Sequence, residues 1–167
     1  MSEITKMDKE ELNEKLDTVS LMMIECYDEI LTKRNQLNTS LDDAFLNLSK
    51  ARSLIGCSSL SILQVPVELE ANVTVNECEK EVTESDVNYK HLNYDLMIKT
   101  KQKTSSNDTE QSIPSLPTWF GVLTPLSLKT SHKSFSQSLY IIKSICELQS
   151  KLANLQLIYS DLKKQLF

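Results

Sequence analysis

The sequence predicts a mostly α-helical protein: a long antiparallel two-helix coiled-coil hairpin with a partly disordered insertion that contains a small β-ribbon. The chain of 167 residues holds only two glycines and four prolines, which favours long helices with few tight turns. Apolar residues recur at steps of three and four near both ends, whereas the middle carries alternating and polar stretches. At this length we expect a single coiled-coil domain over residues 1–167.

The first long helix is predicted over residues 8–55. Asp8, with Glu11 three residues later, has the pattern of a capping box, and Gly56 stands where a left-handed C-terminal cap is expected. A single helix of this kind must bury its apolar stripe against another element to be stable. The stripe consists of Leu12, Leu16, Val19, Met23, Tyr27, Ile30, Leu37, Leu41, Ala44, Leu48, Ala51 and Ile55.

The segment 57–118 is predicted to be an insertion with two short strands and flexible parts. Apolar residues alternate from Val65 to Val75 and again from Tyr94 to Ile98, which is the period of a half-buried strand. These two strands would pair as a ribbon, and a lone ribbon must lean on the helices or on a partner. Residues 77–86 are acidic and polar, and residues 99–111 have the composition of a flexible linker.

The second long helix is predicted over residues 125–167, after a W-F-G segment at 119–124 that contains the only tryptophan. Thr124 before Pro125 favours a helix start, since proline suits the first helical position. The stripe of this helix consists of Leu128, Phe135, Leu139, Ile142, Ile145, Leu148, Leu152, Leu155, Tyr159, Leu162 and Leu166.

A hairpin of two helices has a thin core and leaves flanking apolar residues partly exposed. Such residues are able to accept a third helix or a partner protein. We expect this of Met22, Ile24, Leu31, Phe45, Ile141 and Leu157.

Composition and motifs argue against several classes of function. The net charge of -5 disfavours nucleic-acid binding, and no apolar run is long enough to cross a membrane. The four dispersed cysteines indicate reduced thiols of a cytosolic protein. His91 and His132 lack zinc-ligand spacing, and two glycines cannot form a phosphate-binding loop. We therefore expect no metal, no cofactor and no enzymatic activity, and infer a protein that acts by binding other proteins.

One segment resembles a known family. Residues 119–128 read WFGVLTPLSL and are followed by Phe135, which is similar to the W-F-G-x-L-x-P-x-S-L…F motif of the coiled-coil assembly factor of the vacuolar-type proton ATPase. Lys50 and Arg52, shortly before Gly56, resemble the end of that family's first helix. The motif positions that match are Trp119, Phe120, Gly121, Leu123, Pro125 and Ser127.

The resemblance implies a non-enzymatic assembly factor, or chaperone, for the membrane sector of that ATPase, and hence a role in vacuolar and lysosomal acidification. Such a protein lies peripherally at the cytosolic face of the endoplasmic reticulum. Its partners are a membrane-embedded assembly factor and membrane-sector subunits, and it is a monomer within this heteromeric complex. The matching residues either bind the partner or define the fold. The alternative is a structural coiled-coil scaffold or tethering subunit, which would self-associate through its seams.

Overall fold

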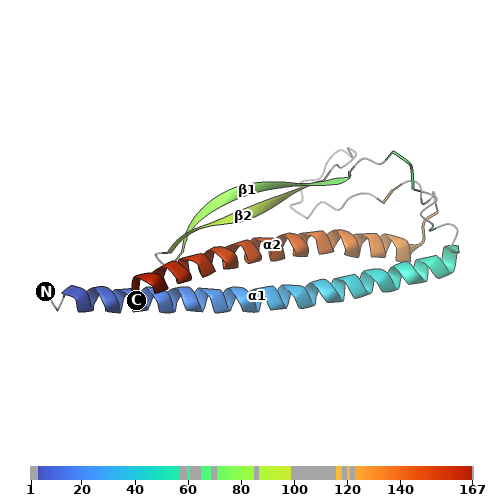
Figure 1. Cartoon of the computed structure of the whole chain (residues 1–167). Helices are drawn as coiled ribbons and strands as arrows, with labels where there is room; N and C mark the ends of the chain where they lie inside the picture. The colour runs from blue at the N-terminus through green and yellow to red at the C-terminus, as the bar shows by residue number, and fades with distance from the viewer. Residues whose placement is uncertain are drawn as a thin grey trace, which may run out of the picture. The chain divides into compact units, whose positions relative to one another are not determined.

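The computed structural model describes residues 4–56, 60, 65–68, 71–84, 87–98, 116–117, 120 and 123–166, with side chains from residue 9 onward except at residue 84. In chain order the elements are α1 (Ile4–Ile55), β1 (Val73–Glu84), β2 (Val87–Ile98) and α2 (Leu126–Leu166) (Figure 1). The chain divides into two compact units. The first unit is Met1–Arg34, Glu77–Tyr94 and Ser144–Phe167, and the second is Asn35–Asn76 and Asp95–Lys143. Each unit therefore contains part of both helices and part of the two-stranded sheet.

In the first unit, α1, α2 and β2 share one hydrophobic core. Its main cluster consists of Val19, Met22, Val87, Tyr89 and Leu155, all of them buried. A neighbouring cluster joins Cys26 and Ile30 of α1 to Leu152 of α2. Residue numbers rise along α1 as they fall along α2 from one cluster to the next, so the two helices run antiparallel within this unit.

In the second unit, small side chains fill much of the contact between α1 and α2. Ala44, Ala51, Ser131 and Ser138 are buried there. The Ser131 hydroxyl donates to the carbonyl of Ala44 at 2.8 Å, and the hydroxyls of Ser40 and Ser138 lie 3.0 Å apart. Because these buried hydroxyls are hydrogen-bonded, they can replace leucines at the contact without an unpaired polar group.

The observed helix ends agree in part with those predicted from the sequence. Gly56 has a φ of 90°, and its N–H donates to the carbonyl of Arg52 at 3.1 Å, which confirms the predicted C-terminal cap. The capping box at Asp8 is wrong, because α1 already begins at Ile4. α2 begins at Leu126, one residue late, and the Pro125 carbonyl accepts from the N–H groups of Leu128 and Lys129 at 3.1 and 3.3 Å.

The predicted fold class, a mostly α coiled-coil hairpin with a partly disordered insertion, is corrected by the structure. The fold combines two long helices with a two-stranded sheet whose strands have twelve residues each. β2 supplies Val87 and Tyr89 to the core, so the sheet is a structural layer of the first unit and not a minor part of a loop. The pattern of burial also departs from a leucine seam, since Leu139 and Ile142 of the predicted stripe are exposed.

The predicted strand from Val65 to Val75 is wrong in its first part, because β1 begins only at Val73; the end of the prediction, Val73 to Val75, does lie in β1. The described residues 65–68, 71 and 72 are not in a strand, and the Val67 side chain is fully exposed. β1 continues instead through the acidic and polar residues up to Glu84, for which the sequence predicts no strand. β2 contains the predicted strand 94–98 and begins seven residues earlier, at Val87. The predicted linker at 99–111 lies outside the described residues.

Candidate interaction site

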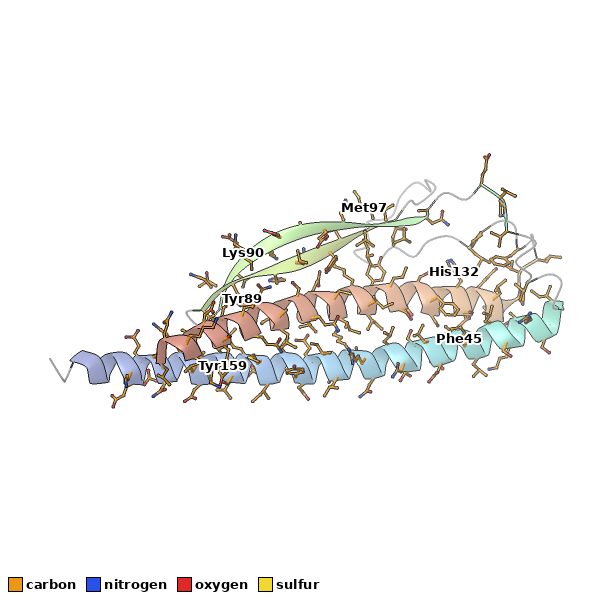
Figure 2. All side chains as sticks on the ribbon, in the orientation of Figure 1. Phe45, Tyr89, Lys90, Met97, His132 and Tyr159 are labelled. Atoms are coloured by element: carbon orange, nitrogen blue, oxygen red, sulfur yellow. The ribbon has the colours of Figure 1, made fainter. Side chains whose placement is uncertain are left out.

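The first surface of interest is the junction of the β-ribbon with α2 in the first unit. The Tyr89 ring of β2 is almost completely buried against the α1 and α2 residues of the main cluster (Figure 2). The Lys151 ammonium group of α2 lies 5.3 Å from the centre of this ring, which places a cation over its π-face. The ribbon is thus attached to the helices by apolar burial and by an aromatic contact.

Two side chains of α2 also bond the backbone of β2. The N–H of Leu92 donates to the Ser150 hydroxyl at 2.8 Å, and the N–H of Tyr94 donates to a Glu147 carboxylate oxygen at 3.1 Å. Because the two donors are two residues apart, they point to the same edge of the strand. Burial, together with the charges of nearby groups, first Glu77 and to a smaller extent Glu147, raises the pKa of the Tyr94 phenol. These bonds satisfy part of a strand edge that would otherwise be open to another chain.

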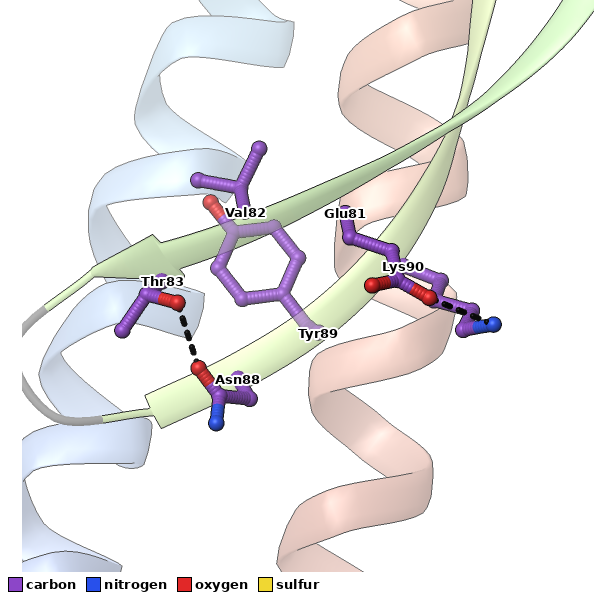
Figure 3. A pocket seen from close by; sticks show the side chains of 6 residues that line it. All are labelled: Glu81, Val82, Thr83, Asn88, Tyr89 and Lys90. Carbon is purple, nitrogen blue, oxygen red and sulfur yellow. Dashed lines mark hydrogen bonds and ion pairs between the residues drawn. The ribbon is translucent and has the colours of Figure 1, made fainter.

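A hollow of about 530 Å³ lies beside the closed end of the ribbon (Figure 3). The Lys90 ammonium group and the Glu81 carboxylate pair across the two strands at 2.7 Å, which lowers the pKa of Glu81 and raises the pKa of Lys90. Both groups are largely exposed, so the pair contributes little stability. The lining of the hollow consists of Glu81, Val82, Thr83, Asn88, Tyr89 and Lys90.

The described residues of this region bring few reactive or metal-binding groups together. Among the described residues that line the hollow there is neither cysteine nor histidine, and Lys90 is paired with Glu81. In a neighbouring hollow, the buried Nδ1 atom of His91 has no hydrogen-bond partner among the described residues. Within the described part of the chain, no three His, Cys, Asp or Glu residues gather as a metal site would require.

In the second unit, an apolar hollow of about 360 Å³ opens beside α2. Partial burial lowers the pKa of the His132 imidazole there, since desolvation disfavours its charged form (Figure 2). The Phe135 ring packs edge-to-face on Phe45 of α1, with 5.1 Å between the ring centres. The hollow is lined by Leu41, Asn72, Val73, His132, Phe135, Ser136, Ser138, Leu139 and Ile142.

The structure describes four of the six W-F-G motif positions; Trp119 and Gly121 lie outside the described residues. Phe120 is half-buried, and its N–H donates to the Pro117 carbonyl at 3.5 Å. The Leu123 side chain is 95% exposed, whereas the Ser127 hydroxyl is buried without a hydrogen-bond partner among the described residues. The motif thus combines an outward-facing leucine with inward-facing positions next to the start of α2.

The two basic candidates, Lys50 and Arg52, are exposed in the last turns of α1. Their side chains form no hydrogen bond or ion pair with any residue that the structure describes, so nothing there joins them to the W-F-G motif. Positive side chains near a helix C-terminus also have a local role, because they interact favourably with the helix dipole. Their assignment as partner-binding residues stays a prediction.

Sequence reasoning missed the residues that hold the ribbon, Glu147 and Ser150. Their spacing of three residues puts them on one face of α2, and that spacing was the only available signal. This signal is weak, because both side chains bond backbone N–H groups of β2, and backbone groups carry no sequence information. Of the residues expected to flank the seam, Ile24, Leu31, Phe45 and Leu157 are exposed as predicted, whereas Met22 belongs to the core.

The fold belongs to a class of protein built from long paired helices and a docked two-stranded sheet, with exposed apolar and charged residues on the helices. Neither of the two described helices is apolar enough over a sufficient length to span a membrane. No family model matches the chain.

The chain is similar to the vacuolar ATPase assembly protein VMA22 of several vertebrates. It is 27% identical to the mouse protein, over 84% of this chain and 85% of that one. It is 26% identical to the bovine protein over 96% of each chain, and 27% identical to the human protein over 85% of this chain and 86% of that one. These relatives confirm the resemblance to a vacuolar ATPase assembly factor that the W-F-G segment indicates.

Proposed function

We propose that this chain is an assembly factor of the vacuolar-type proton ATPase that acts through protein–protein contacts, without catalytic turnover. The observation that carries the proposal is the similarity to VMA22 proteins over at least four fifths of each chain compared. The architecture is compatible with it, because the described helices expose apolar and charged patches, and no cluster of metal-binding groups occurs among the residues that the structure describes.

The finer steps of the proposal concern place and partners. The chain acts on the membrane sector, peripherally at the cytosolic face of the endoplasmic reticulum, as the partner of a membrane-embedded assembly factor. The exposed side of the W-F-G motif contributes to this contact, with Leu123 as its outward anchor. Lys50 and Arg52 provide basic side chains for a second contact. Apolar anchors surrounded by polar residues are the usual composition of such interfaces.

Two exposed leucines make a matched test of this site. Leu123 is a motif position and Leu126 is not, although both are exposed, at 95% and 78%. Neither side chain holds the core, so each alanine substitution should change stability by only about 0.5 kcal/mol or less. Tagged wild-type, Leu123→Ala and Leu126→Ala proteins are purified in mild detergent, and the bound proteins are identified by mass spectrometry.

We expect wild type and Leu126→Ala to recover membrane-sector subunits and a small membrane-embedded protein, and Leu123→Ala to recover much less of both. If wild type brings down no ATPase component, the proposed function is wrong. If Leu123→Ala performs as wild type does, the function stands and the W-F-G motif is not the interface. Recovery of the protein alone, with a constant mass above that of a monomer, would support a scaffold instead.

A further inference from the structure

Helix α1 carries a second apolar stripe on its exposed side in the first unit. Leu21, Ile24, Tyr27 and Leu31 are 61%, 64%, 48% and 58% exposed, at successive spacings of three, three and four. At about 3.6 residues per turn, three of these side chains lie within about 80° of one another around the helix axis. Tyr27 lies at the border with α2, where its hydroxyl accepts a hydrogen bond from the Gln156 amide at 3.3 Å.

This stripe differs from the buried one, which uses Val19, Met22, Cys26 and Ile30 of the same helix. One apolar face per helix is enough to form the core, and single exposed apolar residues are normal on a protein surface. Four at helical spacing over three turns are a continuous patch, which is typical of a protein-binding surface.

Within the stretch of α1 that carries the stripe the charges are of one sign, and Arg34 follows just beyond it, three residues after Leu31. Residues 16–32 contain four acidic residues and no lysine or arginine. Asp17, Glu25, Asp28 and Glu29 are all exposed and form no ion pair with any side chain that the structure describes. Helical spacing places Glu25 one turn after Leu21 at the outer edge of the stripe, Asp17 one turn before Leu21, and Asp28 between Ile24 and Leu31.

We propose that this acidic–apolar stripe binds an amphipathic helix of another protein whose apolar face is bordered by Lys or Arg. Helices recognise one another through anchors at this spacing, and a basic border satisfies the carboxylates. The stripe is about 15 Å long at 1.5 Å per residue, so three turns of the partner are sufficient. A second copy of this stripe would bring like charges together, and an anionic membrane surface would be repelled. The inference does not depend on the ATPase proposal.

The probe is a synthetic, fluorescently labelled peptide helix of about three heptads with leucine anchors and lysines on both borders. The matched control peptide has the same leucines with glutamate at each lysine position. We expect fluorescence anisotropy to show binding of the lysine peptide at least about tenfold tighter than binding of the glutamate peptide. Affinity for the lysine peptide should fall as salt is raised.

Two variants of the full chain test the surface itself. Ile24→Gln combined with Leu31→Gln removes anchors while keeping good helix formers, and should weaken lysine-peptide binding about tenfold. Its control is Leu54→Gln, a 73% exposed leucine of α1 close to Lys50 and Arg52. Glu25→Gln combined with Asp28→Asn should reduce the salt dependence, and Asp42→Asn combined with Asp43→Asn should leave it unchanged.

Amide hydrogen exchange locates the peptide, and far-UV circular dichroism confirms that each variant is folded. Protection confined to the stretch from Asp17 to Leu31 is the expected result. The proposal is overturned if wild type does not bind the lysine peptide, if both peptides bind equally, or if protection appears elsewhere. It is also overturned if wild type self-associates and the Ile24→Gln, Leu31→Gln variant does not, since the occupant is then a second copy.

Discussion

Replacing Tyr89 by alanine tests whether the β-ribbon is a structural layer of the first unit. The Tyr89 ring is only 6% exposed and packs with Val19, Met22 and Leu155 of both helices. Truncation of a buried aromatic side chain costs about 3–5 kcal/mol, because the transfer free energy and the packing around the cavity are both lost. Loss of the Lys151 contact adds about 0.5–1 kcal/mol.

The measurement is urea unfolding followed by circular dichroism at a wavelength dominated by the helices. With a slope of about 2 kcal/mol per M, a loss of about 3–5 kcal/mol lowers the urea midpoint by about 1.5–2.5 M. The control is Tyr27→Ala, a half-exposed tyrosine of α1 that should cost about 1 kcal/mol or less. An unchanged helical midpoint in Tyr89→Ala would show that the ribbon merely lies on the helices, and would refute the shared core.

Two further substitutions have defined signs. Gly56→Ala should lower the free energy of unfolding by about 1 kcal/mol, measured by thermal unfolding, because the φ of Gly56 is 90°. A Cβ there would meet no atom within 4 Å, so the penalty is backbone strain alone. Gly56→Asn should cost less, and equal costs for the two variants would contradict this reasoning. Burial holds the pKa of His132 below 6.5, so the folded state binds this proton less readily than the unfolded state. The stability that neutral His132 contributes is therefore present above pH 6.5 and lost as the pH falls through its folded pKa. Between pH 7 and pH 5 the urea midpoint should fall more in wild type than in His132→Gln, and parallel falls would argue against a buried neutral imidazole.

The sequence was sufficient to predict both long helices, because an apolar period of three and four sustained over about forty residues is typical of a long amphipathic helix and of little else. Their observed ends, Ile4, Ile55, Leu126 and Leu166, lie within four residues of the predicted ones. Which residues of a stripe are buried was harder to predict. An α-helix drifts relative to a seven-residue repeat, so an apolar position such as Ile142 can turn out of the contact.

The strands were only partly predictable, for a physical reason. Most side chains of β1 are exposed, so its sequence has little alternation to detect after Val73 and Val75, whereas the alternating residues described before Val73 are not in a strand. The position of the ribbon depends on contacts with α2, through Tyr89 and the two bonded N–H groups of β2. For the candidate site, the sequence identified the W-F-G motif but did not reveal that Leu123 points outward and that the Ser127 hydroxyl is buried.

The hydrogen bonds from Leu92 and Tyr94 to Ser150 and Glu147 also bear on misassembly. Exchange of the ribbon between two molecules would have to break both bonds and expose the Tyr89 ring to water at the same time. Each of these three losses costs free energy. All three must occur at once, because Tyr89, Leu92 and Tyr94 lie on one strand. While α2 is folded, ribbon exchange is therefore slow and amyloid-like sheets that start from the bonded edge of β2 are disfavoured, so loss of α2 should be the event that makes this chain prone to aggregate.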